Sequence, residues 1–214
     1  MSYEKDVFKS RLVKNAILTQ QYGFPILKKC EIIPEDAISF VDALRTTKFE
    51  NFIHFYIHDE EFERVWRTPE RYLPLFKKFS GVISTDFSLY RELPLSMQIW
   101  NTYRNRAIGY WLQQNGVDVI PNIRWGDERT YHFAFEGISK GGTVSVSTNG
   151  CIRDKLDRYY FNKGLAKMVE VIEPDVIVNY SYTPDDIFKK YKDDGIKIVH
   201  LKGRFEKMKE RMKC

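Results

Sequence analysis

Polar and aromatic side chains follow several short apolar runs of the chain, at the points where the predicted strands end. Asp86 follows the run GVIST, Arg124 and Trp125 follow the run VDVIPNI, and Ser147 and Asn149 end the run TVSVSTN. Because the carboxyl ends of parallel strands meet at one edge of a sheet, we expect these side chains to lie around one polar pocket. The predicted binding residues are Asp86, Asn101, Asn122, Arg124, Trp125, Ser147, Asn149, Asn179 and Tyr180.

These residue types suit a phosphorylated or nucleotide-like ligand. The planar guanidinium of Arg124 can hold a phosphate or carboxylate through two parallel hydrogen bonds. Trp125 or Tyr180 can stack on a base, and Asp86, the candidate catalytic residue, can bind a sugar hydroxyl or a metal, or transfer a proton. The alternative is that the small polar residues on one face of each strand hydrogen-bond with one another in the core.

No established catalytic or cofactor signature accompanies these residues. The chain contains no GxxxxGK[ST] loop, no GxGxxG after a strand, no HExxH and no GxSxG. Its four histidines and its three widely spaced cysteines, Cys30, Cys151 and Cys214, lack the spacing of metal ligands. We therefore expect no metal, no cofactor and reduced cysteines.

The elements that must position the pocket repeat one pattern, in which a short run rich in β-branched residues precedes a longer stretch of helical periodicity. A Gly or Pro then closes the unit, and this alternation is typical of parallel strands joined by helices. The predicted strands are Pro25 to Ile33, Asn51 to Ile57, Gly81 to Phe87, Val117 to Arg124, Thr143 to Thr148, Val176 to Tyr180 and Ile196 to Leu201.

Helices are predicted between these strands. One opens at Pro34 with acidic residues in its first turn, and a second, from Glu60 towards Lys78, is broken at Pro69. In the helix predicted from Ser96 to Asn115, an aromatic stripe marks the face expected to pack on the sheet: Met97, Trp100, Tyr103, Ala107 and Tyr110. Further helices are predicted at Phe161 to Ile172 and Asp185 to Tyr191, and the segment from Tyr131 to Phe135 fits either a short helix or an extra strand.

This pattern predicts a single α/β domain over residues 1–214, with a mostly parallel sheet. We favour an irregular or incomplete barrel-like closure, because almost every connection is short and small polar residues recur among the apolar residues of the later strands. The alternative is a doubly wound open sheet. No apolar run is long enough to span a bilayer and no signal peptide is recognisable, so we expect a cytoplasmic protein with no membrane contact.

A modest positive charge favours a second function class, the nucleic-acid-binding proteins. The formal net charge is +5, and part of it lies in a basic tail at about residues 203–214. The stretch from Trp100 to Arg106 also interleaves aromatic and basic residues. A buried helix face explains the aromatics equally well, and a solvated helix explains the tail.

Between Gly81 and Asn149 the sequence resembles a known family. The run GVISTDFSLYRELPLSMQIWNTYRNRAIGYWLQQNGVDVIPNIRWG, with TVSVSTNG and the later PDVIVNYS, is similar to an uncharacterised family, a domain of unknown function, encoded by bacteriophages and bacterial mobile elements. The resemblance covers roughly residues 81–203. It implies a setting in a bacterial host cell, and a role in host takeover or counter-defence, where some proteins bind or degrade nucleotide signals.

Together these observations predict a protein that binds, or binds and hydrolyses, a small phosphorylated or nucleotide-like molecule at the carboxyl ends of its strands. Nucleic-acid binding or processing is the first alternative, and a protein-binding inhibitor without chemistry is the second. The sequence predicts neither an oligomeric state nor whether the protein is an enzyme.

Overall fold

The strands are short, and all of their pairings are parallel. The computed structural model describes residue 6 and residues 8–212, the side chain of Arg211 excepted. Within that part of the chain the strands are β1 (Ala37–Ser39), β2 (Phe52–His54), β3 (Gly81–Ile83), β4 (Val119–Ile120), β5 (Thr143–Ser147), β6 (Val176–Tyr180) and β7 (Lys197–Leu201). The predicted α/β fold with parallel strands is confirmed, and β2 to β7 each lie inside a predicted strand.

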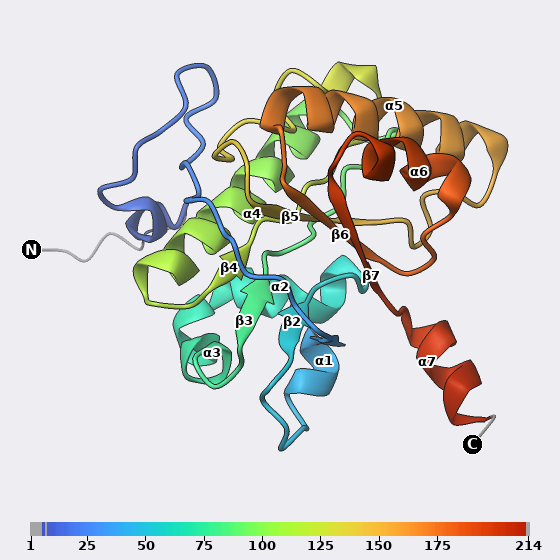
Figure 1. Ribbon diagram of the computed structural model, residues 1–214. Coiled ribbons are helices and arrows are strands. Elements are labelled where there is room, and N and C mark those ends of the chain that lie inside the picture. The colour runs from blue at the N-terminus through green and yellow to red at the C-terminus, as the bar shows by residue number, and fades with distance from the viewer. Residues whose placement is uncertain (1–5, 7, 213–214) are drawn as a thin grey trace, which may run out of the picture.

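The strands follow one another in space in the order of the chain. One sheet has the order β1-β2-β3-β4 and a second the order β5-β6-β7. A parallel bridge between Asn122 and Ser145 joins the end of β4 to β5, so the order runs unbroken from β1 to β7 (Figure 1). This sequential order is that of a strand–helix barrel, whereas a doubly wound sheet reverses its order at a switch point.

The sheet curls until non-neighbouring strands touch across its inner side. The ring of Tyr180 on β6 lies 4.4 Å from the ring of His54 on β2 and 4.9 Å from that of Tyr56. In the described part of the chain no strand pairing joins β7 back to β1. The arrangement is therefore an incomplete barrel, with a packed interior and an unpaired seam.

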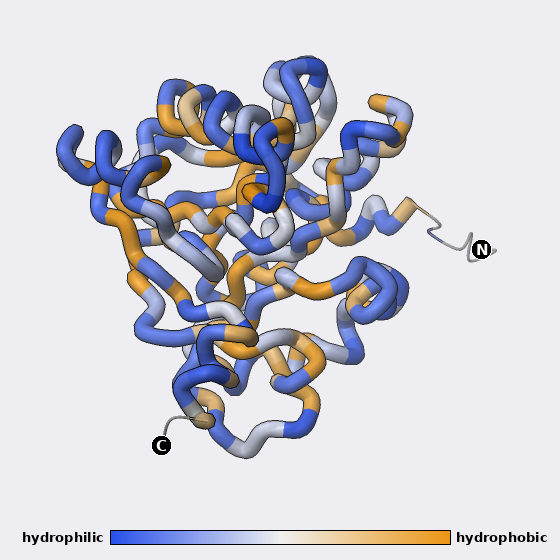
Figure 2. The backbone as a smooth tube through the Cα atoms, turned by 90° about the vertical axis from the view of Figure 1, so that its right-hand side faces the viewer, coloured by the Kyte–Doolittle hydropathy of each residue, from blue (hydrophilic) through white to orange (hydrophobic). Residues whose placement is uncertain are grey.

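Helices cover the outside of this curled sheet, and the apolar stretches lie towards the middle of the molecule (Figure 2). Burial of these apolar surfaces is the main driving force for the fold. The helices are α1 (Phe40–Ala43), α2 (Asp59–Arg67), α3 (Pro69–Phe76), α4 (Leu95–Gln114), α5 (Lys155–Ile172), α6 (Asp185–Asp193) and α7 (Arg204–Arg211), with short 3-10 helices at Ser10–Val13 and Glu128–Thr130. The predicted break at Pro69 is confirmed.

The first predicted strand is wrong. The segment from Pro25 to Ile33 is extended, but its hydrogen bonds go to separate parts of the chain: Leu27 N donates to Gly137 O of a turn, and Thr143 N at the start of β5 donates to Cys30 O. No single neighbouring strand runs along the segment, so only isolated bridges form. The ambiguous segment from Tyr131 to Phe135 is likewise neither strand nor regular helix, and forms turns after the second 3-10 helix.

The helix predicted to open at Pro34 is also wrong at its start, because the first strand of the sheet begins at Ala37. The Asp36 carboxylate accepts a hydrogen bond from Ala37 N, and Asp36 O accepts one from Phe52 N of the neighbouring strand. The helix begins only at Phe40, where the Ser39 side chain caps it by accepting from Asp42 N. Pairing with β2 thus overrides the local helix signal.

Helix α4 forms where it was predicted, and its predicted packing face is right only in part: Ala107 and Tyr110 are buried, whereas Met97 and Trp100 are exposed. Trp100 is 38% exposed and Met97 is 50% exposed. The buried face instead carries polar side chains as well as apolar ones, including Gln98, Asn101 and Asn105. Arg104 has a side chain only 12% exposed, which pairs with Glu63.

Helix α7 extends from the end of β7 and stands apart from the other helices in Figure 1. Lys207 of this helix donates hydrogen bonds to Asp36 Oδ1 at 2.6 Å and to Ala37 O at 2.8 Å. The basic tail therefore touches β1 across the seam of the barrel. Residues 213–214 of the predicted tail, with Cys214, lie outside the described residues.

None of the described helices is both long enough and apolar enough to cross a membrane.

Candidate functional site

A cavity of about 320 Å³ opens at the carboxyl ends of β3, β4 and β5. This size is at the lower end of the range for small-molecule sites. Its polar and aromatic lining comes from the segments that follow these strands and from the first turns of α5: Arg91, Arg124, Trp125, Ser147, Asp157 and Tyr160. Three of these six residues, Arg124, Trp125 and Ser147, were predicted from the sequence.

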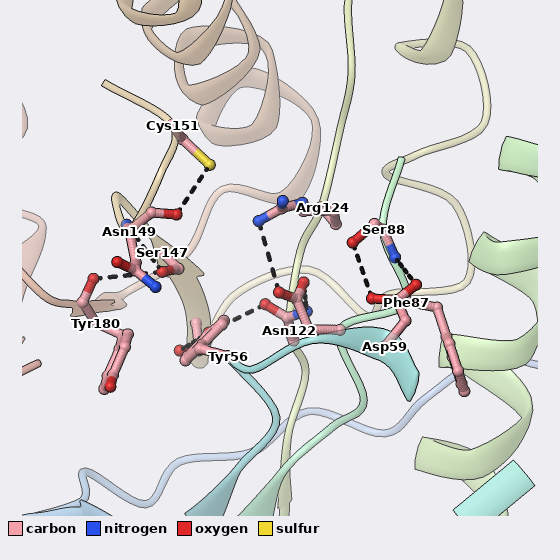
Figure 3. A network of polar contacts seen from close by, with 12 residues as sticks. Tyr56, Asp59, Phe87, Ser88, Asn122, Arg124, Ser147, Asn149, Cys151 and Tyr180 are labelled. Carbon is pink, nitrogen blue, oxygen red and sulfur yellow. Dashed lines mark hydrogen bonds and ion pairs between the residues drawn. The ribbon is translucent and has the colours of Figure 1, made fainter. Parts of the chain in front are cut away.

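Asp86 and Arg124 form an ion pair beside this cavity. Figure 3 shows Arg124 above Asn122. Arg124 Nη1 lies 3.5 Å from Asp86 Oδ2, and Asn122 Nδ2 donates to Asp86 Oδ1 at 2.8 Å. Desolvation raises the pKa of Asp86, while Arg124 and Asn122 oppose the rise; the Asp86 carboxylate in turn raises the pKa of Arg124. Arg124 is thus a fixed cation with its side chain 21% exposed, and Asp86 lies behind it at 7%.

Asn122 connects this pair to the interior of the barrel. Its Oδ1 lies 3.0 Å from the hydroxyl of Tyr56, which lies 2.6 Å from Ser145 Oγ. Asn122, Tyr56 and Ser145 are all buried. The network fixes both oxygens of Asp86 and so fixes where the guanidinium of Arg124 can lie. The side chains of Asp86 and Asn122 hold Arg124 and do not line the cavity.

A second arginine, Arg91, also lines the cavity. Arg91 Nη2 donates to Asp157 Oδ1 at 2.6 Å, and its guanidinium lies 4.7 Å above the ring of Tyr160. Asp157 and Tyr160 belong to the first turns of α5. The cavity is therefore lined by two guanidiniums, and each is paired with a carboxylate.

The segment that carries Arg91 is fixed to α4 by buried amides. Asn105 accepts from Phe87 N and donates to Phe87 O, Asn101 donates to Ser88 O at 2.7 Å, and Gln98 donates to Leu93 O. Asn101, predicted as a ligand-binding residue, thus supports the segment after β3 that lines the cavity. The amides lie on one side of α4 because they are three or four residues apart.

Arg106 of α4 fixes the segment that follows β4. Its guanidinium is fully buried and donates to three backbone carbonyls, those of Glu136, Asn122 and Ala134. Desolvation lowers the pKa of Arg106 to about 9. Because no described carboxylate pairs with it, its role is to satisfy carbonyls that no strand pairs.

Trp125 forms an apolar wall of the cavity. Its indole nitrogen donates to Tyr160 O at 3.2 Å, and its ring packs against Phe135 and Phe161. The ring also lies on Gly164 of α5, where an added Cβ would come within 2.1 Å of the indole nitrogen. The wall is therefore rigid, and α5 needs a glycine at this contact.

Ser147, Asn149 and Cys151 lie together on the β5 side of Arg124 (Figure 3). Ser147 Oγ accepts from Asn149 N at 3.1 Å, and Cys151 Sγ lies 3.5 Å from Asn149 O. Ser147 and Cys151 line the cavity, whereas Asn149 is exposed. Both described cysteines are free, and Cys151 adds a thiol that no sequence pattern had indicated.

Asn179 and Tyr180 do not line the cavity. Asn179 Nδ2 lies within hydrogen-bonding distance of Ser181 O, Tyr182 O and Thr183 Oγ1, and so holds the turn after β6. Tyr180 points into the barrel, where it contacts His54, whose pKa burial lowers to about 3. Of the predicted set, the structure brings Asp86, Asn122, Arg124, Trp125 and Ser147 together.

The sequence analysis missed Arg91, Asp157, Tyr160 and Cys151. These residues come from a loop and a helix start, outside the strand pattern that guided the prediction. Among the described residues, no cluster of three or more His, Cys, Asp or Glu side chains is arranged to hold a metal ion. The polar side chains that line the cavity are therefore the guanidiniums of Arg91 and Arg124, the carboxylates of Glu92 and Asp157, the hydroxyls of Ser147 and two tyrosines, and the thiol of Cys151.

Comparison with known proteins places the chain among phage proteins. It is 36% identical over 128 residues to the Gene 1 protein of Mycobacterium phage D29, which covers 60% of this chain and 47% of that protein. It is 36% identical over 166 residues to the Gene 1 protein of Mycobacterium phage L5, covering 74% of this chain and 71% of that protein. The chain thus spans about half the length of the D29 relative.

No solved structure matches the chain. The expected resemblance to an uncharacterised, phage-associated family is confirmed, and it extends closer to the N-terminus than residue 81. Residues 16–202 match the family described as Domain of unknown function (DUF4417), and the chain belongs to this family.

Proposed function

We propose that the chain binds a small phosphorylated or nucleotide-like molecule in the cavity at the carboxyl ends of β3, β4 and β5. The observation that carries the proposal is the position of Arg124, whose guanidinium is fixed by Asp86 and lines the cavity. A buried ion pair of this kind seldom stabilises a fold more than apolar residues would. Its presence beside a cavity therefore favours a role in binding an anion.

The rest of the lining supports the same ligand class. Arg91 supplies a second cation, and Trp125 and Tyr160 supply flat apolar surfaces suited to a base or another planar group. Asp86 is a positioning residue in this proposal, because Arg124 lies between it and the cavity. The carboxylates that line the cavity are those of Glu92 and Asp157.

Two basic residues of α4 do not support nucleic-acid binding on that helix. Arg104 pairs with Glu63 at 2.7 Å and lies over the ring of Phe87, and Arg106 is fully buried. Neither guanidinium is available to a phosphate backbone. The basic side chains of the stretch from Trp100 to Arg106 are instead engaged in contacts within the protein.

Calorimetric titration with ribonucleoside 5′-monophosphates and inorganic phosphate tests the proposal. We expect Arg124→Gln to weaken binding by about 10- to 100-fold, the loss of a charge-assisted hydrogen bond. The double variant Asp86→Asn/Arg124→Gln removes both charges and should lose binding without leaving an unpaired carboxylate. Arg45→Gln, which changes an exposed arginine at the other end of the strands, is the matched control.

Wild-type affinity in the Arg124→Gln variant, or no binding of any of these phosphorylated compounds to the wild-type protein, would overturn the proposal. We also propose a biological setting, counter-defence against a nucleotide-signalling system of the host; its support is that the relatives are phage proteins. Expression of the chain in a bacterium that carries such a system should restore phage plating. Expression of Arg124→Gln should not.

A further inference from the structure

The outward face of α5 carries a stripe of cationic and aromatic side chains. Lys155, Tyr159 and Lys163 are four residues apart, so they lie in a row, with successive members about 6 Å apart along the helix. All three side chains are exposed, and that of Tyr159 is 47% exposed. We call these three residues the α5 stripe.

The cations of the α5 stripe are free to meet an anion. Neither lysine forms a salt bridge with any described residue, and Lys163 Nζ lies 5.6 Å from the ring centre of Tyr159. The carboxylates at the start of α5 are already engaged: Asp154 caps the helix, and Asp157 pairs with Arg91. The stripe therefore presents net positive charge.

The α5 stripe is continuous with the rim of the cavity. The ring of Tyr160, which lines the cavity, lies 5.3 Å from the ring of Tyr159. Two more exposed tyrosines flank the same end of the barrel, Tyr90 at the cavity and Tyr182 after β6. Thr148 Oγ1 donates to Tyr182 O, which ties the second of these to the end of β5.

We propose that the cavity and the α5 stripe together bind the phosphorylated end of a single-stranded nucleic acid. The terminal phosphate lies at Arg124, and the following nucleotides run along the stripe. This inference rests on the proposed function for the cavity and names its ligand. Leu89, Ile123 and Phe161 line the cavity and are buried, so a strand held at Arg124 continues outward along the exposed stripe and not into the core.

Exposed aromatic rings next to free cations are the features by which proteins hold single strands. Each base can stack on a ring whatever its sequence, and the lysines meet the phosphates. A base pair hides its faces within a duplex, so the stripe favours an unpaired strand. The binding should weaken as salt rises, because counterions are displaced from the strand.

Fluorescence anisotropy tests the inference with a short oligothymidylate in three forms: 5′-phosphorylated, 3′-phosphorylated, and without a terminal phosphate. Thymidine 5′-monophosphate serves as the competitor for the cavity alone. We expect one phosphorylated form to bind at least tenfold more tightly than the unphosphorylated form. Removal of the stripe in Lys155→Gln/Tyr159→Ala/Lys163→Gln should weaken that binding by about 5- to 100-fold and leave thymidine monophosphate binding unchanged.

The control variant is Lys28→Gln/Lys48→Gln, which removes two exposed lysines at the other end of the strands. One outcome would overturn this inference and leave the proposed function standing. In it, thymidine monophosphate binding depends on Arg124, but the stripe variant binds the oligonucleotide as tightly as the wild-type protein does. Equal binding of the phosphorylated and unphosphorylated strands would also overturn it. No monophosphate binding at all would overturn both.

Discussion

Asp86 and Arg124 show how the site is built at the scale of single residues. The carboxylate is buried, with Asn122 on one oxygen and Arg124 on the other. Burial disfavours the charged form of Asp86, and the guanidinium offsets that effect. The pair is therefore mutually dependent, and removal of Arg124 alone leaves a buried carboxylate without its cation.

This dependence predicts how stability varies with pH. Burial raises the pKa of Asp86 above its ordinary value of 3.8, so the folded state binds the proton more tightly than the unfolded state. The group's contribution to stability thus falls as pH rises from about 4 through the folded pKa. Arg124→Gln raises that pKa further. The total loss of stability between acid and neutral pH should therefore grow, by about 1.4 kcal/mol for each added pKa unit.

Urea denaturation of the wild-type protein and of Arg124→Gln at about pH 4.5 and about pH 7 measures the difference. In Asp86→Asn/Arg124→Gln the titrating carboxyl is gone, so the extra pH dependence should disappear. Equal pH dependence in the wild-type protein and the single variant would show that Asp86 does not depend on Arg124.

The sequence could predict the central part of the candidate site and not its rim. Asp86 follows β3, Arg124 follows β4 and Ser147 ends β5. β3 pairs with β4, and a bridge joins the end of β4 to β5, so the expectation that neighbouring strand ends meet was enough to bring these residues together. Arg91 and Asp157 meet only because a loop after β3 approaches the start of α5. No local pattern encodes that approach.

At the scale of elements, α4 works as an anchor for two irregular segments. Asn101 and Asn105 hold the segment after β3, and Arg106 holds the one after β4. Backbone groups in such segments lack strand partners, and side chains must satisfy them when they are buried. A polar helix face directed inward is the result.

We predict that Asn105→Ala destabilises the protein by about 2 to 4 kcal/mol, because it leaves both the N–H and the C=O of Phe87 without their partner. Trp100→Ala on the same helix should cost only about 1 to 2 kcal/mol, because Trp100 is 38% exposed. Chemical denaturation of the two variants gives both values. A larger loss from Trp100→Ala than from Asn105→Ala would contradict the anchoring role.

The helix itself was predictable from the sequence, and its inward face only in part, at Ala107 and Tyr110. Its length and end follow from local periodicity and from Gly116, which has a positive φ of 77° just after the helix. Its orientation depends on the unpaired carbonyls of distant segments, which compete with the aromatic stripe for the buried side. A long-range contact also overrides the local signal near Ala37. The predicted start of a helix there forms strand β1, because it pairs with β2.

At the scale of the whole molecule, the strands form a barrel that is not closed by hydrogen bonds in the described part of the chain. The outer edge of β7 is exposed along much of its length, with Lys197 and His200 on the surface. Such an unpaired edge should open more readily than a strand with two neighbours. The sequential order could be favoured from sequence because the connections are short, whereas the missing closure depends on how far the sheet curls.

Helix α7 crosses that open seam, which leads to a prediction for the tail. Deletion of residues 207–214 removes the bonds from Lys207 to Asp36 and Ala37, and takes with it Met208, which is 47% exposed. Because the described part of this segment leaves Met208 and Met212 exposed, we expect the truncated protein to fold and to bind the same ligands. The amides of β1 and β7 should exchange hydrogen faster than in the full chain, while those of β3 and β6, each paired on both sides, should keep their protection.

Hydrogen–deuterium exchange with peptide-level mass spectrometry resolves the strands, and Lys209→Gln in the full chain serves as a control for loss of tail charge. Loss of soluble protein on truncation, or faster exchange in β3 and β6, would mean that α7 supports the core of the barrel and not only its seam.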